Sequence, residues 1–234
     1  VEDCALMLNV VAGYDPEDPG SADVAVPDFT EGLGKGLKGL RIGVVRHFYE
    51  DSLEPDDAMR VAFETAVRAL TELGATVEDA TLDPLEEYHA CKVLLSEAEF
   101  YAVHEKDLQE NLHLFGTKMA RRVSAGMFIS AADYIHAQRR RHKLARSMIQ
   151  AFQGFDAMVT LTTLGPAPLD DPEPVGRTLQ GPNLTTPFSV TGFPAMSIPT
   201  GFDDRGLPLA MQIIAKPFDE AMVFRVGHAY ERST

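Results

Sequence analysis

Tryptophan is absent from this sequence, and cysteine is nearly so, with two residues in 234. Cys4 and Cys91 cannot build a disulfide framework, so a reducing compartment is the simplest reading, and we predict a cytoplasmic protein. We expect each cysteine to act as a small, partly buried hydrophobe. No apolar run reaches the roughly eighteen residues of a membrane-spanning helix. No charged-then-apolar signal peptide is visible either, so a membrane partner is not expected.

Basic residues are scarce too, with 21 Lys and Arg against 35 Asp and Glu and a net charge of −14. A general affinity for nucleic acid needs a basic surface, so the composition argues against such a partner. The charge is uneven, because residues 1–30 hold seven acids and no Lys or Arg, while residues 118–146 hold eight Lys or Arg and one acid. A solvated helix face explains the basic stretch most simply.

Recognisable catalytic and metal motifs are also missing. The chain has no Gly-x-Ser-x-Gly elbow, no phosphate-binding glycine loop and no histidine pair at metal-ligand spacing. Each of the seven histidines is therefore read as a surface or core residue. The sequence predicts neither a metal site nor a cofactor.

The first third of the chain has the pattern of an α/β fold. We expect a helix over 2–12, a long loop over 14–39 rich in Pro, Gly and Asp, and a strand over 40–45. Pro55, Asp56 and Asp57 open the next helix, whose apolar stripe ends before Gly74, and a strand begins at Ala75. This strand–helix–strand order predicts a parallel pair of strands.

Residues 84–152 read as mostly helical, in three pieces with breaks near Gly116 and Gly126. Ser130 and Asp133 resemble a capping box at the start of the last piece. Strands and loops follow, with a strand over 156–161, a loop over 162–187, a short strand over 195–198 between prolines, an apolar central strand over 207–215 and a final helix from Asp219 to about Tyr230.

The run from Asn183 to Ala195 combines small hydroxyl residues, a turn-forming Gly192 and Pro194, and little charge. Such a composition suits the wall of a pocket for a neutral ligand. It suits equally a buried helix–strand corner with capped backbone groups, and both readings stay open.

Two polar residues fall at positions expected to be buried. On a helical wheel of residues 131–152, Arg141 lies inside the apolar arc, so its guanidinium needs an acidic partner, backbone carbonyls or a ligand. Gln212 lies among apolar residues of the expected central strand and must also find partners. A structural role is the simpler reading for both.

Two runs of the C-terminal quarter resemble the amidase signature family: Thr186 to Phe202, with the letters TPFSVTGFPAMSIPTGF, and Gly206 to Glu220. The opening helix with Gly13-Tyr14-Asp15, and the strand at 40–45, resemble the segments that follow the catalytic stretch of that family. The resemblance covers nearly the whole chain and implies a mixed-sheet α/β/α sandwich of the amidase signature type, here its C-terminal portion.

The family resemblance implies hydrolysis of a carboxamide by a serine nucleophile, with a second serine and a lysine relaying the proton. This chain has no Ser-Ser pair and no Gly-Gly-Ser run. Its seven lysines all follow the point where the resemblance begins. We therefore assign no catalytic residue to this chain.

The resemblance carries over substrate contacts only. Arg141 lies where related amidotransferase A subunits hold a substrate carboxylate, and Thr162 and Asn183 resemble pocket-edge positions. With Gln212 they form the predicted substrate-binding set. Those subunits have an acid just before the Leu-Thr-Thr-Pro run, where this chain has Pro182 and Asn183.

We accordingly predict one domain over 1–234, the C-terminal part of an amidase signature domain, with residues 84–152 as a helical insertion. The first residues read as the middle of a longer protein, so we expect a preceding half with the catalytic residues, a small amide as substrate, and an inactive chain when it is alone. Exposed sheet surface predicts cover by that half or homo-oligomer formation. The alternatives are a non-catalytic binding or scaffold module and a glutamine-dependent aminoacyl-tRNA amidotransferase A subunit.

Overall fold

The computed structural model describes residues 1–51, 53–168 and 182–234. The chain divides into two compact units. Unit 1 comprises Val1–Thr81, Ala151–Pro166 and Phe193–Thr234, and unit 2 comprises Leu82–Gln150 and Ala167–Gly192. The single domain expected from the sequence stays a prediction.

Unit 1 is built on a five-stranded mixed sheet in the order β2-β1-β3-β5-β4. Strand β1 (Arg41–Val44) is parallel to both β2 (Thr76–Asp79) and β3 (Ala157–Leu161), and β5 (Pro208–Ala215) is antiparallel to β3 and to β4 (Ala195–Phe202). The predicted parallel pair and the predicted central strand are therefore confirmed. β5 lies between two neighbours, and its residues 211–215 are buried, which accounts for its unbroken apolar run.

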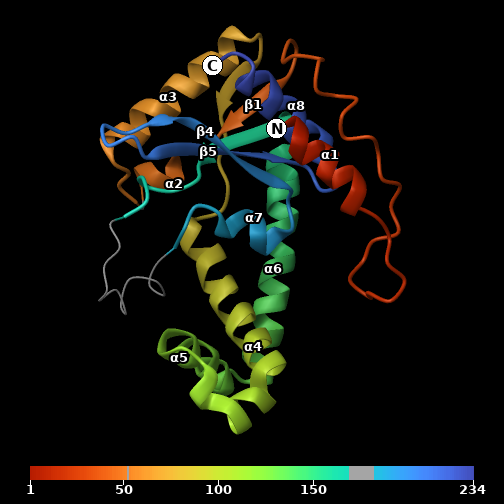
Figure 1. Cartoon of the computed structure of the whole chain (residues 1–234), viewed down its shortest axis with the longest axis vertical. Coiled ribbons are helices and arrows are strands. Elements are labelled where there is room, and N and C mark those ends of the chain that lie inside the picture. Colours follow the sequence, from red (N-terminus) through yellow and green to blue (C-terminus); the bar gives the residue numbers. More distant parts are fainter. Residues whose placement is uncertain (52, 169–181) are drawn as a thin grey trace. The chain divides into compact units, whose positions relative to one another are not determined.

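The longest helix of unit 1, α3 (Asp57–Glu72), connects β1 to β2. Five of the six residues of the expected stripe are buried, namely Met59, Phe63, Ala66, Val67 and Leu70, and the sixth, Ala62, is half-buried. α8 (Glu220–Glu231) packs beside α3, and both contact β4 and β5. Unit 1 also contains α1 (Glu2–Val11), the short α2 (His47–Glu50), which the sequence did not predict, and the one-turn η3 (Phe152–Gly154). These helices and the sheet give the predicted α/β fold (Figure 1).

One strand is longer than the sequence predicts. β4 continues through Pro199 to Phe202, and its register with β5 shifts between Pro199 and Gly201. A proline cannot donate to a ladder but is tolerated on an edge strand or at a bulge. The expectation that Pro199 ends the strand was therefore wrong, because this strand is at the edge.

Unit 2 is helical, as the sequence predicts for residues 84–152. It contains α4 (Leu85–Asn111), η1 (Leu112–Leu114), α5 (Thr117–Ala125), η2 (Gly126–Phe128), most of α6 (Ala131–Ala151) and α7 (Thr186–Thr191). α4 and α6 run antiparallel side by side (Figure 1), linked by Arg140 to Glu87, Cys91 to the Ala137 carbonyl and Tyr134 to Glu99.

Other local predictions have mixed outcomes. The capping box is confirmed, since the Asp133 amide donates to Ser130 Oγ (3.1 Å) and the Ser130 amide donates to Asp133 Oδ2 (3.2 Å). Cys91 is buried, but Cys4 is exposed, so its expected partial burial was wrong. Residues 169–181 of the loop predicted over 162–187 lie outside the described residues.

Candidate functional site

The carboxyl ends of β1 and β3 lie side by side in unit 1. β1 connects through α3 to β2 on one flank and pairs with β3 on the other, so the strand order reverses between β1 and β3. In open α/β sheets, ligands bind outside such a reversal. The buried Thr160 hydroxyl donates to the Val45 carbonyl (2.8 Å) and closes the two strand ends against each other.

Thr162 lies just beyond this closure, one residue after β3 ends. Its amide donates to the Ala210 carbonyl (3.2 Å), and its hydroxyl is 3.1 Å from the hydroxyl of Ser197 on β4. Thr162 is half-buried and Ser197 is exposed. This hydroxyl pair can both donate to and accept from a neutral polar group. Ser197 was not predicted as a site residue, although alternation along β4 places it on the same face of the sheet as Ala195.

Gln212 lies on β5, opposite Ser197 on β4 and Thr160 on β3. Only 3% of the residue is exposed, and its Nε2 donates to the Leu161 carbonyl (2.8 Å). The amide thus finds the backbone partner that a buried position requires. The contact holds the end of β3 immediately before Thr162.

Asn183 is exposed and caps the amino end of α7 in unit 2. Its Oδ1 accepts from the Thr186 amide (2.9 Å), the Thr186 hydroxyl (2.6 Å) and the Thr185 hydroxyl (3.0 Å). A side-chain oxygen at this place satisfies donors that a helix start leaves without intrahelical partners. The oxygen is used by the cap, and the Nδ2 group makes no hydrogen bond within the described residues, so it is the part of Asn183 open to a ligand.

Arg141 binds near the other end of α7. Its Nε donates to the Val190 carbonyl (2.8 Å). Gly192 takes the left-handed conformation (φ 77°) and its amide bonds the Phe188 carbonyl, which ends the helix and leaves later carbonyls without helical donors. A cation near such carbonyls is also favoured by the helix dipole. Asn183 and Arg141, the two predicted substrate contacts of unit 2, therefore bind α7 at its two ends.

The expected burial of Arg141 was wrong. The residue is exposed, although Ala137, Leu144 and Met148 of the same arc are buried. A long side chain can leave an apolar face and place its charged head in water. Within the described residues, the two Nη groups of Arg141 make no hydrogen bond or ion pair. They form an open two-nitrogen edge that suits a carboxylate.

The four predicted residues form two pairs. Thr162 and Gln212 belong to unit 1, and Arg141 and Asn183 belong to unit 2. Ser197 joins the first pair, while α7 connects the second.

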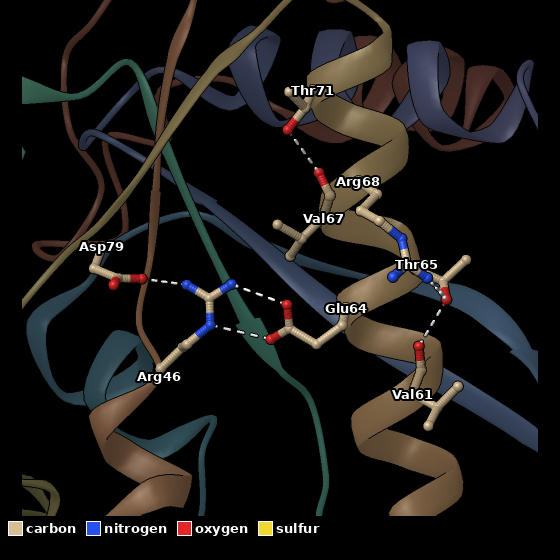
Figure 2. A network of polar contacts seen from close by, with 8 residues as sticks. All are labelled: Arg46, Val61, Glu64, Thr65, Val67, Arg68, Thr71 and Asp79. Carbon is tan, nitrogen blue, oxygen red and sulfur yellow. Dashed lines mark hydrogen bonds and ion pairs between the residues drawn. The ribbon is translucent and has the colours of Figure 1, made fainter.

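A charged network at the end of β1 was not predicted (Figure 2). Arg46 binds Glu64 of α3 through two bonds, from Nε to Oε1 and from Nη2 to Oε2, both 3.0 Å. Its remaining Nη1 pairs with Asp79, the last residue of β2. The hydrogen bonds to Glu64 raise the pKa of Arg46, and burial raises the pKa of the neighbouring Tyr49. With its charge fully paired, Arg46 connects β1, α3 and β2. An arginine directly after a parallel strand was the available signal.

No three His, Cys, Asp or Glu side chains of the described residues gather as the ligands of a metal ion would. In the same part of the chain, none of the helices combines the length and the apolar character that a bilayer crossing requires.

Comparison with known proteins identifies the family. The amidase family profile matches residues 1–224. An amidase from Pseudomonas putida is 35% identical over 100% of this chain and 51% of its own length. The A subunit of a glutamyl-tRNA(Gln) amidotransferase from Lysinibacillus sphaericus is also 35% identical, over 100% of this chain and 53% of its own length.

The fold is found in solved structures as well. A bacterial aryl acylamidase of the amidase signature family superposes with a TM-score of 0.83 at 24% identity, over 99% of this chain and 51% of that one. The chain spans about half the length of the relatives it matches. The matched part is the C-terminal half of these enzymes. Sequence and fold agree, and the chain belongs to the amidase family.

Proposed function

We propose that this chain is the substrate-side portion of an amidase that hydrolyses the carboxamide C–N bond of a small linear amide. The observation that carries the proposal is the family match over residues 1–224. It combines with a sequence in which no Ser-Ser pair occurs. The family match and the missing Ser-Ser pair are both consistent with a chain that lines the substrate pocket and carries no nucleophile.

In the proposed mechanism, the nucleophilic serine, the relaying serine and the lysine lie in a preceding half of the same protein. A serine hydroxyl is a weak nucleophile until a base takes its proton, so those three groups must act together. The residues of this chain bind and orient the amide. The chain alone is expected to be inactive.

The surface of α1 supports a preceding half. Four apolar side chains of this helix are exposed, from 51% to 82% of their area: Leu6, Met7, Val10 and Val11. Among the described residues, β4 pairs only with β5, so its outer edge is open. Apolar patches and open strand edges are normally covered. We infer that the preceding half covers them.

The proposed substrate contacts differ in chemistry. The Nη edge of Arg141 suits a carboxylate on the acyl side of the amide. The hydroxyls of Thr162 and Ser197 suit a neutral polar group. Gln212, buried and bonded to the Leu161 carbonyl, positions Thr162, while Asn183 positions α7 and offers its Nδ2 group.

The second candidate is an amidotransferase A subunit. It is favoured by relatives such as the one from Lysinibacillus sphaericus, which is 35% identical. The neutral Asn183, where those subunits carry an acid, favours the amidase. Glutaminase activity of the complete protein, with stable co-purification of a second protein chain, would support the amidotransferase.

The test compares the purified chain with the complete gene product. We expect ammonia release from simple amides by the complete protein and none above the blank by the chain alone. Ammonia release by the isolated chain would contradict the proposal. A complete gene that encodes neither the two serines nor the lysine of the family mechanism would instead support a non-catalytic binding module.

A further inference from the structure

The end of unit 2 that lies away from α7 forms a compact helical tip, which we define as residues 97–130 (Figure 1). It contains the last turns of α4, then η1, α5 and η2. No residue of the tip belongs to the predicted substrate-binding set. Any role of the tip therefore depends on its own surface.

The tip is tightly built inside. A side chain added at Gly126 of η2 would come within 2.1 Å of the Glu97 carbonyl oxygen on α4, so the two backbones touch. Glu97 is 8% exposed and accepts from Arg122 of α5 (3.0 Å), and that guanidinium lies 5.0 Å from the centre of the Phe100 ring. These contacts pack α4, α5 and η2 against one another inside the tip.

The outside of the tip carries several large apolar side chains. Six large apolar side chains are exposed by between 42% and 83% of their area: Val103, Leu112, Leu114, Met119, Met127 and Phe128. Single exposed hydrophobes are ordinary, and six of them within one short segment are candidates for an interaction surface. Methionine and aromatic residues are also enriched in protein interfaces.

The charge of the tip favours a second copy of this chain as its partner. The tip carries five acids and four bases, a net charge of −1, within a chain of net charge −14. Two copies of this acidic chain therefore repel each other only weakly at their tips. By contrast, the exposed apolar residues of α1 lie within residues 1–30, whose seven acids have no Lys or Arg beside them. Two copies of that region would repel strongly.

The acidic and basic residues of the tip also lie on different elements. The α4 part holds all five acids with one base, Lys106, and α5 holds three bases with no acid. Arg122 of α5 and Glu97 of α4 already pair with each other, which leaves four acids of α4 and two bases of α5 for other contacts. Glu110 and Arg121 are exposed members of the two sets. A two-fold axis brings the same surface of two copies together, so α5 of each copy can face the acidic end of α4 in the other. A uniformly charged partner, such as an anionic membrane, would meet like charge on half of the surface.

We propose that the tip is a homodimer contact, in which the six apolar side chains form the centre and Glu110 and Arg121 pair across a two-fold axis. This inference does not depend on the proposed amidase activity. The contact is also distinct from the proposed covering of α1 by a preceding half, because the tip lies in unit 2 and α1 lies in unit 1.

Sedimentation velocity of the complete protein over a concentration series tests the contact. The wild type should form a dimer. Val103→Glu and Phe128→Glu should raise its dissociation constant by about tenfold or more, since an unpaired charge enters an apolar centre. Val61→Glu is the matched control, because Val61 is a 65% exposed valine of α3 in unit 1. It should leave the dimer unchanged, and circular dichroism should show that all three variants are folded.

A charge swap tests the symmetry. Glu110→Arg alone and Arg121→Glu alone should each weaken the dimer, whereas an equimolar mixture should restore heterodimers. A monomeric wild type at every concentration would overturn the proposal. So would a dimer that Val61→Glu weakens while Val103→Glu and Phe128→Glu do not. Binding of the wild type to anionic vesicles without dimer formation would assign the tip to a membrane instead.

Discussion

Arg141 and Val190 join the middle of α6 to the last turn of α7 through a single hydrogen bond of 2.8 Å, from Nε to the carbonyl oxygen. The bond occupies the Nε of the guanidinium and leaves the edge formed by the two Nη groups open to a ligand. A lysine could reproduce the charge but not both edges, since its ammonium is a point donor. Arg141 can therefore hold α7 and a ligand at the same time.

In the complete enzyme, we expect Arg141→Ala to raise KM about tenfold or more for an amide that carries a carboxylate. It should have a small effect on an uncharged amide of the same size. The lost bond to α7 should lower the free energy of unfolding by about 1 kcal/mol. Steady-state kinetics with the two amides and urea unfolding measure these effects.

Arg146→Ala is the control for this variant, because Arg146 is exposed on α6 and makes no hydrogen bond within the described residues. It should change neither KM. If Arg141→Ala reduced turnover of both amides equally, Arg141 would act only through α7. The assignment of a carboxylate contact would then be wrong.

Asn183 makes a second prediction about α7. Asn183→Ala removes the oxygen that accepts three hydrogen bonds, and we expect a loss of about 1–2 kcal/mol in the free energy of unfolding. Asn183→Asp keeps an acceptor at the same place and should cost far less. Urea unfolding of both variants checks this. Equal destabilisation by the two substitutions would show that the cap does not depend on the oxygen.

The sequence predicted most of the fold because its signals are local. An unbroken apolar run predicted the buried β5, and two glycines predicted the breaks around α5. The strand end predicted at Pro199 was wrong, because a strand tolerates proline only at certain places in a sheet, and the place of a strand is set when the whole sheet assembles.

The candidate site was predicted less well for a related reason. A helical wheel gives the direction of a Cα–Cβ bond, and that direction placed Arg141 among buried residues. The wheel does not show where a long side chain ends, and Arg141 reaches a carbonyl 49 residues away in the sequence. Ser197 depends on the register of β4 against β5, which alternation alone does not fix.

The Arg46 network gives a third prediction. Arg46→Met removes a two-bond pair to Glu64 and the contact to Asp79, and leaves Glu64 half-exposed without its partner. We expect a loss of about 1–2 kcal/mol, discounted because both acids reach solvent. The matched control is Arg68→Met, since within the described residues Arg68 of α3 bonds only to Thr65, one turn away (Figure 2).

Thermal unfolding of the two methionine variants at low and high salt distinguishes the network from a surface pair. A partly buried pair is screened less than an exposed one, so the loss in Arg46→Met should persist at high salt. If the loss disappeared with salt, or if Arg68→Met lost as much, the network would have no special role in joining β1, α3 and β2.

The capping box at the start of α6 makes stability depend on pH. Hydrogen bonds from the Ser130 hydroxyl and amide lower the pKa of Asp133 below its ordinary value of 3.8. A lowered pKa in the folded state stabilises the fold above the unfolded pKa, and this contribution is lost as the pH falls through the folded pKa. Ser130→Ala should therefore destabilise unit 2 at neutral pH, with a difference from wild type that shrinks below pH 3.8. Urea unfolding monitored by helical circular dichroism at both pH values measures that difference, and a constant difference would mean that Ser130 acts through its hydroxyl at the Asp133 amide alone.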